Sequence, residues 1–151
     1  MPVPAPIMMV CAGNLCRSPF AEGLMRNRLQ QAGVEAECYS RGLIPMPGRR
    51  APDTAVRIAG EFGVDLSTHI SQTVLRPDIE RAGLVLAMEP AQRQHLIRMS
   101  PSSTGKIFIL SQPAHGQAIP DPVGQDEDVF RAVYDEISGY IDTWLQRFGV
   151  A

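Results

Sequence analysis

The sequence predicts a single α/β domain, in which a four-stranded parallel sheet is flanked by helices on both faces. The chain has 151 residues, a length typical of one domain with its own core. Hydrophobic residues make up 44% and charged residues 20%, which is an ordinary globular composition. Short apolar runs alternate with stretches of helical periodicity, the pattern of a parallel sheet with crossover helices. We expect the domain to span residues 1–151.

The first half of the chain begins with a buried strand. Ile7–Val10 is a continuous apolar run, and we expect this strand to end at Cys11. Apolar residues then recur every three or four positions up to Ala32, which predicts a helix. Ser18 and Pro19 suit the start of that helix and Gly33 suits its end. Further along we expect a strand over 36–40, a Pro/Gly/Arg-rich loop over 42–52, and a helix capped by Asp53 that reaches Phe62.

The second half repeats the alternation. Apolar runs at 84–88 and 107–110 predict the third and fourth strands, and 92–99 predicts a helix between them. The last helix carries one apolar stripe from Val129 to Phe148 that includes Trp144 as a core residue. Acidic residues at 126–128 lie where the helix dipole favours negative charge.

Composition also excludes several partners and cofactors. Net charge is −2 with no basic block, so we expect neither nucleic acid nor a membrane surface as partner. No apolar run approaches the roughly 18 residues of a membrane span, and the first six residues do not resemble a secretory signal. Three cysteines are too few for a disulfide scaffold and favour the reducing cytoplasm. No His/Cys cluster has metal-ligand spacing, so we expect neither metal nor cofactor.

The segment after the first strand carries the chemistry. A loop between a strand and a helix can turn its N–H groups inward around an anion, and the helix terminus adds positive potential. Gly13 and Asn14 tolerate the unusual backbone angles that such a loop needs, and Arg17 offers a planar fork matched to phosphate oxygens. Cys11 at the base of these donors is favoured as thiolate, a strong nucleophile. The segment therefore predicts a phosphoryl-transfer site that needs no metal, the alternative being an ordinary tight turn with one buried cysteine.

The segment Val10–Pro19 resembles the signature of the low-molecular-weight protein tyrosine phosphatases. The similarity extends over almost the whole chain, through Ser40, the stretch 65–69, Met88–Glu89 and the stretch 119–122. The resemblance implies a bacterial-type enzyme that hydrolyses protein phosphotyrosine through a cysteinyl-phosphate intermediate and releases inorganic phosphate. By analogy, the partner is a bacterial tyrosine kinase.

The resemblance also assigns roles to residues. It implies that Cys11 is the nucleophile, that Arg17 binds phosphate, and that Asp121 is the general acid and later the base. From the residues alone, Asp121 between two prolines indicates only a surface turn. The phosphate-binding loop then comprises Ala12, Gly13, Asn14, Leu15, Cys16, Arg17 and Ser18.

A supporting network and a second thiol follow from the same resemblance. It implies that Ser40 and His69 join Asn14 and Ser18 in hydrogen bonds behind the loop, and that Cys16 forms a reversible disulfide with Cys11. Taken alone, His69 is typical of a loop or core position, and Cys16 of a small buried side chain. Cys38 lies in a predicted strand and is expected in the core.

The expected rim of the cleft departs from the family pattern. Many members place aromatic side chains around the pocket, whereas here Val123 follows the Asp-Pro pair and the loop after the second strand contributes Met46. Each lost aromatic contact weakens ring stacking by about 1 kcal/mol. Arg49 and Arg50 in that loop are expected to be a solvated pair.

Three other functions remain open at this point. A protein arginine phosphatase has the same loop; those relatives typically carry Thr where this chain has Leu15, but Val123-Gly124 is similar to them. Thiol-linked arsenate reduction would need further cysteines, and none follows Cys38. A non-catalytic phosphate-binding module would be expected to lack the nucleophile or the acid, and both Cys11 and Asp121 are present.

Overall fold

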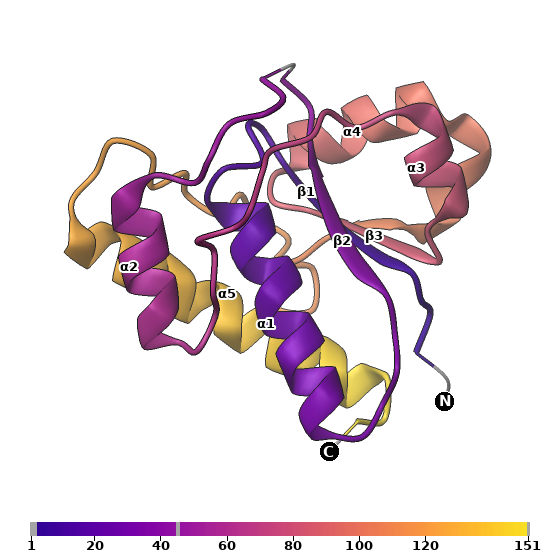
Figure 1. Ribbon diagram of the computed structural model, residues 1–151. Coiled ribbons are helices and arrows are strands. Elements are labelled where there is room, and N and C mark those ends of the chain that lie inside the picture. Colours follow the sequence, from indigo (N-terminus) through magenta and orange to yellow (C-terminus); the bar gives the residue numbers. More distant parts are fainter. Residues whose placement is uncertain (1–2, 45, 151) are drawn as a thin grey trace.

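A computed structural model describes residues 3–44 and 46–150, and it contains the predicted sheet (Figure 1). Four parallel strands lie in the order β2-β1-β3-β4, so β1 is central and pairs with both β2 and β3. Because the chain extends the sheet first to one side of β1 and then to the other, a crevice forms at the carboxyl end of β1, where such sheets bind ligands. The strands are β1 Ile7–Cys11, β2 Cys38–Gly42, β3 Leu84–Ala87 and β4 Ile107–Ile109.

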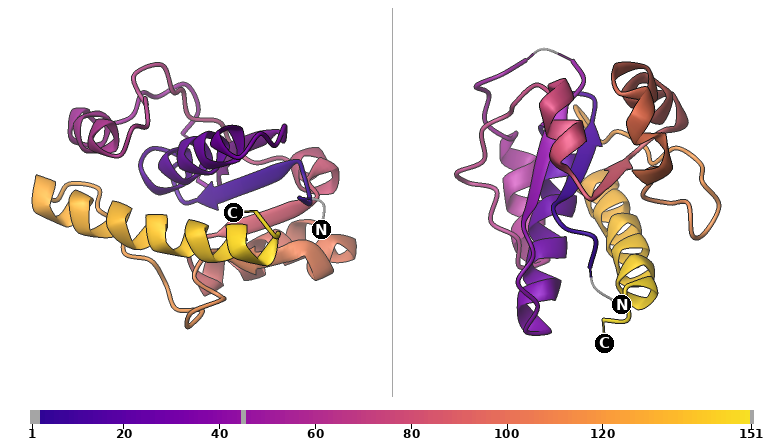
Figure 2. Two further views of the ribbon diagram at one scale, coloured as in Figure 1. Left: turned by 90° about the horizontal axis from the view of Figure 1, so that it is seen from below. Right: turned by 90° about the vertical axis from the view of Figure 1, so that its right-hand side faces the viewer.

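Helices cover both faces of the sheet, as predicted. One group of helices packs on one face, with the long last helix running beside the first (Figure 2). Two shorter helices pack on the opposite face. The first group comprises α1 Arg17–Gln31, α2 Asp53–Glu61 and α5 Glu127–Arg147, and the second comprises α3 Arg76–Arg81 and α4 Pro90–Met99. A 3₁₀ helix, η1, spans Pro101–Lys106.

Alternate residues of β1 serve the two cores. Ile7 and Met9 pack toward α1 and α5, whereas Met8 and Val10 pack toward α3 and α4. All four side chains are fully buried, which explains the unbroken apolar run. Aromatic stacking reinforces the larger core, where the rings of Phe20 and Tyr134 lie 3.8 Å apart and nearly parallel.

Several predicted boundaries were wrong. β2 covers 38–42 rather than 36–40, because the pairing of Ile7 opposite Cys38 fixes its register. Asp53 is the first residue of α2 rather than its cap, and no side chain caps that end. The short elements α3 and η1 were not predicted, since six residues are too few to display a period.

Smaller differences occur at other ends. α1 begins at Arg17 without a side-chain cap, α4 begins two residues before the predicted 92–99, and β3 and β4 each end one residue early. Gly33 follows α1 with a φ of 73°, as a helix-ending glycine should. The Asp126 side chain accepts the N–H of Val129 and caps α5. None of the helices in the described part of the chain is long and apolar enough to cross a membrane.

Candidate active site

The loop between β1 and α1 presents unpaired backbone donors. Its carbonyl groups are used by neighbours: Leu43 N–H donates to Cys11 O at 3.1 Å, and Ile44 N–H donates to Ala12 O at 2.8 Å. No backbone N–H of residues 12–16 donates to another described residue. A loop with bonded carbonyls and free amides has the polarity of an anion-binding nest.

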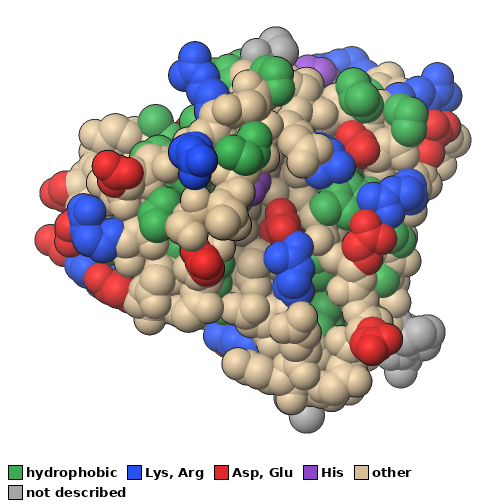
Figure 3. All heavy atoms as spheres, in the orientation of Figure 1, with side chains coloured by type: hydrophobic (Ala, Val, Ile, Leu, Met, Phe, Trp, Pro, Cys, Tyr) green, Lys and Arg blue, Asp and Glu red, His purple; other side chains and the backbone are tan. Residues whose placement is uncertain are grey.

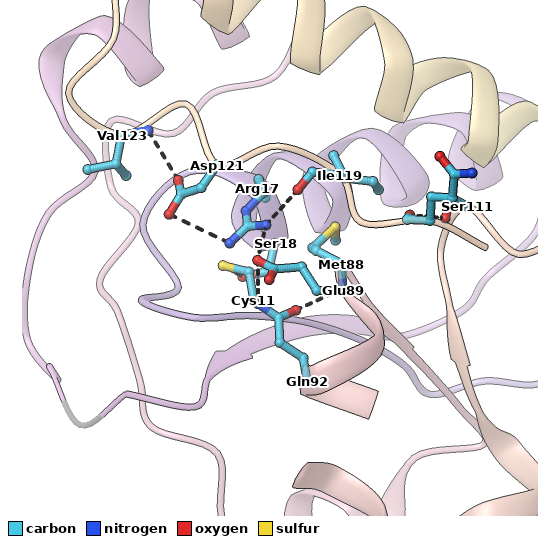
Figure 4. Close-up of polar contacts among 11 residues, drawn as sticks. Cys11, Arg17, Ser18, Met88, Glu89, Gln92, Ser111, Ile119, Asp121 and Val123 are labelled. Atoms are coloured by element: carbon cyan, nitrogen blue, oxygen red, sulfur yellow. Dashed lines mark hydrogen bonds and ion pairs between the residues drawn. The ribbon is translucent and has the colours of Figure 1, made fainter. Parts of the chain in front are cut away.

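Cys11 lies at the base of this loop. It ends β1 and is buried, with 3% of its surface exposed. Its Sγ atom is 2.9 Å from Oγ of Ser18, in the first turn of α1 (Figure 4). A hydroxyl at this distance can donate to a thiolate, and a hydrogen bond to the charged form stabilises it.

Asn14 holds the loop from behind. Its φ of 56° is the only positive value among the described non-glycine residues, and the left-handed region costs roughly 1–2 kcal/mol. Its Nδ2 donates to Ser18 Oγ and to Ser40 Oγ, both at 2.9 Å. Nε2 of His69 lies 2.7 Å from the Asn14 carbonyl oxygen. The structure thus brings together Asn14, Ser18, Ser40 and His69, the set expected from the sequence.

Gly42, at the end of β2, lies directly against the backbone of the phosphate-binding loop. A Cβ atom there would lie 2.9 Å from the carbonyl oxygen of Ala12 and 3.0 Å from the Asn14 backbone nitrogen. Both contacts are with loop backbone, which cannot swing aside as a flexible side chain could. A side chain at this position is therefore incompatible with the observed loop.

The Arg17 guanidinium is hydrogen-bonded to the protein through Nη1, while its Nε has no partner among the described residues. Its Nη1 donates to Oε2 of Glu89 at 2.7 Å and to the carbonyl oxygen of Ile119 at 2.8 Å (Figure 4). Its Nη2 lies 3.6 Å from Oδ2 of Asp121, and its buried Nε has no partner among the described residues. The guanidinium is therefore held in place while it keeps donors for a ligand.

Asp121 stands at the mouth of the cleft. Its side chain is half-exposed, and Oδ1 accepts the backbone N–H of Val123 at 3.1 Å. This bond orients the carboxyl group within the turn that Pro120 and Pro122 stiffen. Asp121 was identified by resemblance alone, and the fold places it beside Arg17.

The cleft itself is small and its rim is aliphatic. It has a volume of about 180 Å³, with Cys11, Arg17 and Asp121 among its lining residues. Met46 and Val123, the predicted rim residues, line it together with Leu15 and Ile44. Pro45, which lies between Ile44 and Met46 in the sequence, is outside the described residues. No aromatic side chain contributes to the described lining.

Burial makes the thiols of the other two cysteines weaker acids than an ordinary cysteine. Burial, together with the nearby Cys11 and Asp121, raises the pKa of Cys16 to about 12 against the opposing effect of Arg17. Burial likewise raises the pKa of Cys38 to about 11. Both thiols are neutral at physiological pH. The Cys16 carbonyl oxygen accepts the hydroxyl of Tyr134 at 2.9 Å, which ties the loop to α5.

Comparison with known proteins decides the family. A family model described as low molecular weight phosphotyrosine protein phosphatase matches residues 6–150. The chain belongs to this family. It is 33% identical over 141 residues to the probable low molecular weight protein-tyrosine-phosphatase EpsP of Ralstonia nicotianae, covering 93% of this chain and 94% of that protein.

Two solved structures of relatives have the same fold. Wzb of Vibrio vulnificus, in complex with benzylphosphonate, matches with a TM-score of 0.86 and 28% identity, covering 93% of this chain and 97% of the other. The YwlE arginine phosphatase of Geobacillus stearothermophilus matches with a TM-score of 0.84 and 33% identity, covering 95% and 92%. Relatives of this chain are therefore named both as protein-tyrosine-phosphatases and as an arginine phosphatase.

Sequence reasoning missed several residues that support this phosphatase site. Glu89, which holds Arg17, lies two residues after the end of β3, the strand beside β1, and its place near a strand end was an available signal. Glu22 is four residues after Ser18 on α1, so both lie on one helix face. Ile44 and the backbone groups of Ile119 and Gln72 enter only through the tertiary fold.

Proposed function

We propose that this protein is a protein-tyrosine-phosphatase that transfers the phosphoryl group to Cys11 and then to water, without a metal or cofactor. The observation that carries the proposal is the meeting of Cys11, Arg17 and Asp121 around one small cleft. These residues supply a nucleophile, a fork of donors and a proton source. We propose that residues 1–151 form one catalytic domain.

In the first step, the Cys11 thiolate attacks phosphorus in line with the ester oxygen. The S–P bond forms as the P–O bond breaks, and the protonated Asp121 carboxyl gives its proton to the leaving oxygen. The free N–H groups of the loop, with Nε and Nη2 of Arg17, bind the non-bridging oxygens. Because these donors are held before substrate arrives, they stabilise the transition-state charge without reorganisation.

In the second step, water attacks the cysteinyl-phosphate. The Asp121 carboxylate takes a proton from that water, the S–P bond breaks, and inorganic phosphate leaves. The sulfur departs as a thiolate, which the Ser18 hydroxyl at 2.9 Å can stabilise. The same carboxyl group thus acts as acid in one step and base in the next.

The proposed substrate is a phosphotyrosine-bearing protein, and a bacterial tyrosine kinase is the proposed partner. Support comes from the names of the relatives, among them the protein-tyrosine-phosphatases EpsP and Wzb. The aliphatic rim can contact the faces of a tyrosine ring through dispersion. We place the protein in the cytoplasm, since all three cysteines are free thiols.

A protein arginine phosphatase is the second candidate. It is favoured by the match to the YwlE arginine phosphatase and by the absence of aromatic residues from the described rim. Leu15 at the cleft favours the tyrosine-directed reading, because an apolar side chain offers a guanidinium no hydrogen-bond acceptor.

One assay tests both candidates. Turnover is measured on matched phosphotyrosine and phosphoarginine peptides, with and without chelator, for the wild type and Cys11→Ser. We expect faster turnover of phosphotyrosine, no effect of chelator, and no turnover by the variant. Faster turnover of phosphoarginine would favour the second candidate, and normal activity of Cys11→Ser would exclude both.

A further inference from the structure

The hydrogen bonds behind the phosphate-binding loop do not end at Ser40. Its Oγ donates to Oε1 of Glu22 at 2.6 Å, and Glu22 pairs through its other oxygen with Arg26 one helical turn later. The connected chain therefore runs from Cys11 through Ser18, Asn14 and Ser40 to Glu22. Its last member was not assigned a role by the sequence.

The partners of Asn14 set the direction of the hydrogen bonds at the centre of this chain. The backbone N–H of Gln72 can only donate, and it donates to Oδ1 of Asn14 at 2.9 Å. Both hydrogens of Asn14 Nδ2 then point to Ser18 and Ser40. Ser18 Oγ accepts one of them, so its own hydrogen is available for the sulfur of Cys11.

The far end of the chain needs an acceptor. Ser40 Oγ accepts from Asn14, so its hydrogen must point elsewhere, and a carboxylate is a group that only accepts. Glu22 supplies that carboxylate at a short distance. Without it, the Ser40 hydroxyl would rotate to find another partner, and its bond to Asn14 would weaken. Chains of hydrogen bonds polarise one another, so a loss at one end is felt along the chain.

We propose that Glu22 is a positioning residue for the phosphatase reaction, which keeps Asn14 in its left-handed conformation and directs the Ser18 hydrogen at Cys11. This inference rests on the proposed function. Glu22 does not line the catalytic cleft and acts through Ser40 and Asn14. Its contribution is to the geometry of the loop and to the reactivity of the sulfur.

Glu22 connects the buried network to a second hollow on the molecular surface. This hollow, of about 390 Å³, lies over α1 and β2, and charged side chains gather around it (Figure 3). The Glu22 side chain is 18% exposed there, so solvent reaches the end of the chain that is farthest from Cys11. The charged or titratable side chains around the hollow are those of Glu22, Arg26, Cys38, Tyr39, Arg41, Asp65 and His69.

The sign of the effect separates positioning from charge. A carboxylate acting only through its field would disfavour a thiolate, so its removal would make Cys11 react at lower pH. A carboxylate acting through the hydrogen-bond chain favours the thiolate, so its removal would make Cys11 react only at higher pH. The two roles therefore predict opposite shifts.

The test compares Glu22→Ala, Glu22→Gln and Arg26→Met with the wild type. The rate of Cys11 alkylation by iodoacetamide is followed against pH by peptide mass spectrometry, alongside kcat and KM on a phosphotyrosine peptide. The glutamine variant keeps an acceptor oxygen and the shape of the side chain. Arg26→Met removes the ion pair and leaves the Glu22 carboxylate.

For Glu22→Ala we expect an alkylation profile displaced to higher pH and a kcat about three- to tenfold lower, the loss typical of one hydrogen bond. Glu22→Gln should lie between alanine and wild type, and Arg26→Met should stay within about twofold of wild type. An unchanged profile, a shift to lower pH, or equal effects of alanine and glutamine would overturn the inference. If the wild type hydrolyses neither phosphopeptide, the proposed function fails, while the alkylation profiles still decide the role of Glu22.

Discussion

Arg17, which lines the catalytic cleft, forms an ion pair with Glu89, with 2.7 Å between Nη1 and Oε2. The Arg17 side chain is buried, whereas the Glu89 side chain is 35% exposed. Gln92 donates to the same carboxylate oxygen at 3.2 Å. This pair uses Nη1 of Arg17, so the remaining nitrogens keep donors for a phosphate group.

Glu89→Ala should impair catalysis more than folding. A charge-assisted hydrogen bond contributes about 1.5–3 kcal/mol, so we expect kcat/KM on a phosphotyrosine peptide to fall roughly ten- to a hundredfold. Glu89→Gln should lose less, because its amide oxygen still accepts from Arg17. Glu80→Ala serves as the control, since its pair with Arg76 is exposed and remote from the cleft. Wild-type kinetics in Glu89→Ala would show that Arg17 needs no anchor.

Asp121→Asn should slow the reaction in proportion to how poorly the leaving group departs. Loss of a general acid costs about 10²–10⁴ in rate, and we expect kcat for phosphotyrosine to fall within that range. An aryl phosphate with a strongly acidic phenol needs little proton transfer and should be much less affected in the first step. Single-turnover rates of phenol release on a series of aryl phosphates measure this. An equal loss across the series would mean that Asp121 does not protonate the leaving oxygen.

Alkylation should be selective for one thiol. The pKa values of Cys16 and Cys38 are raised to about 12 and about 11, so both stay protonated and react slowly with an alkylating agent until the pH approaches those values. At pH 7.5 we expect iodoacetamide to modify Cys11 alone, measured by peptide mass spectrometry, with parallel loss of activity. Prior saturation with phosphate should protect Cys11 from alkylation. Modification of Cys16 at a comparable rate would contradict the assignment.

Cys16 should make oxidation of the enzyme reversible. Peroxide converts the Cys11 thiolate to a sulfenic acid, which condenses with the Cys16 thiol to a disulfide and releases water. We expect the wild type to recover its activity with dithiothreitol after peroxide treatment, while Cys16→Ala loses it permanently. Cys38→Ala is the matched control and should recover like the wild type. Equal recovery in all three proteins would argue against the disulfide.

Tyr134→Phe should destabilise the protein without disturbing its aromatic stack. The phenylalanine ring keeps the packing on Phe20, but the buried carbonyl oxygen of Cys16 loses its donor. An unsatisfied buried acceptor costs about 1–3 kcal/mol, which urea denaturation would measure as a lower free energy of unfolding. Tyr140→Phe removes a more exposed hydroxyl from the same helix and should change stability by less than about 0.5 kcal/mol. Equal losses in the two variants would remove the special role of the Cys16 contact.

The phosphate-binding loop could be predicted because its functional residues lie close together in the sequence. Cys11 and Arg17 are six positions apart, so one strand, one loop and one helix start suffice to bring them together. The long apolar stripe of α5 was equally plain. In contrast, the six residues of α3 carry no readable period, and the register of β2 depends on its pairing with β1.

Contacts between residues that lie far apart in the sequence could not be predicted in this way. Glu89 reaches Arg17 across 72 positions and Glu22 reaches Ser40 across 18, and no sequence spacing announces either contact. Asp121 was found only because the surrounding residues resemble a known family. The sequence alone therefore indicated a phosphate-binding loop, and the fold added the residues that hold its side chains in place.

Gly42 limits where this pocket can be redesigned. The strand end presses directly on the loop, so bulk added there would push the floor upward and damage the sheet edge at the same time. The aliphatic side chains of Ile44 and Val123 are about half exposed and have room to change. Engineering for bulkier or smaller phosphoesters should therefore vary the lip of the pocket and leave its base untouched.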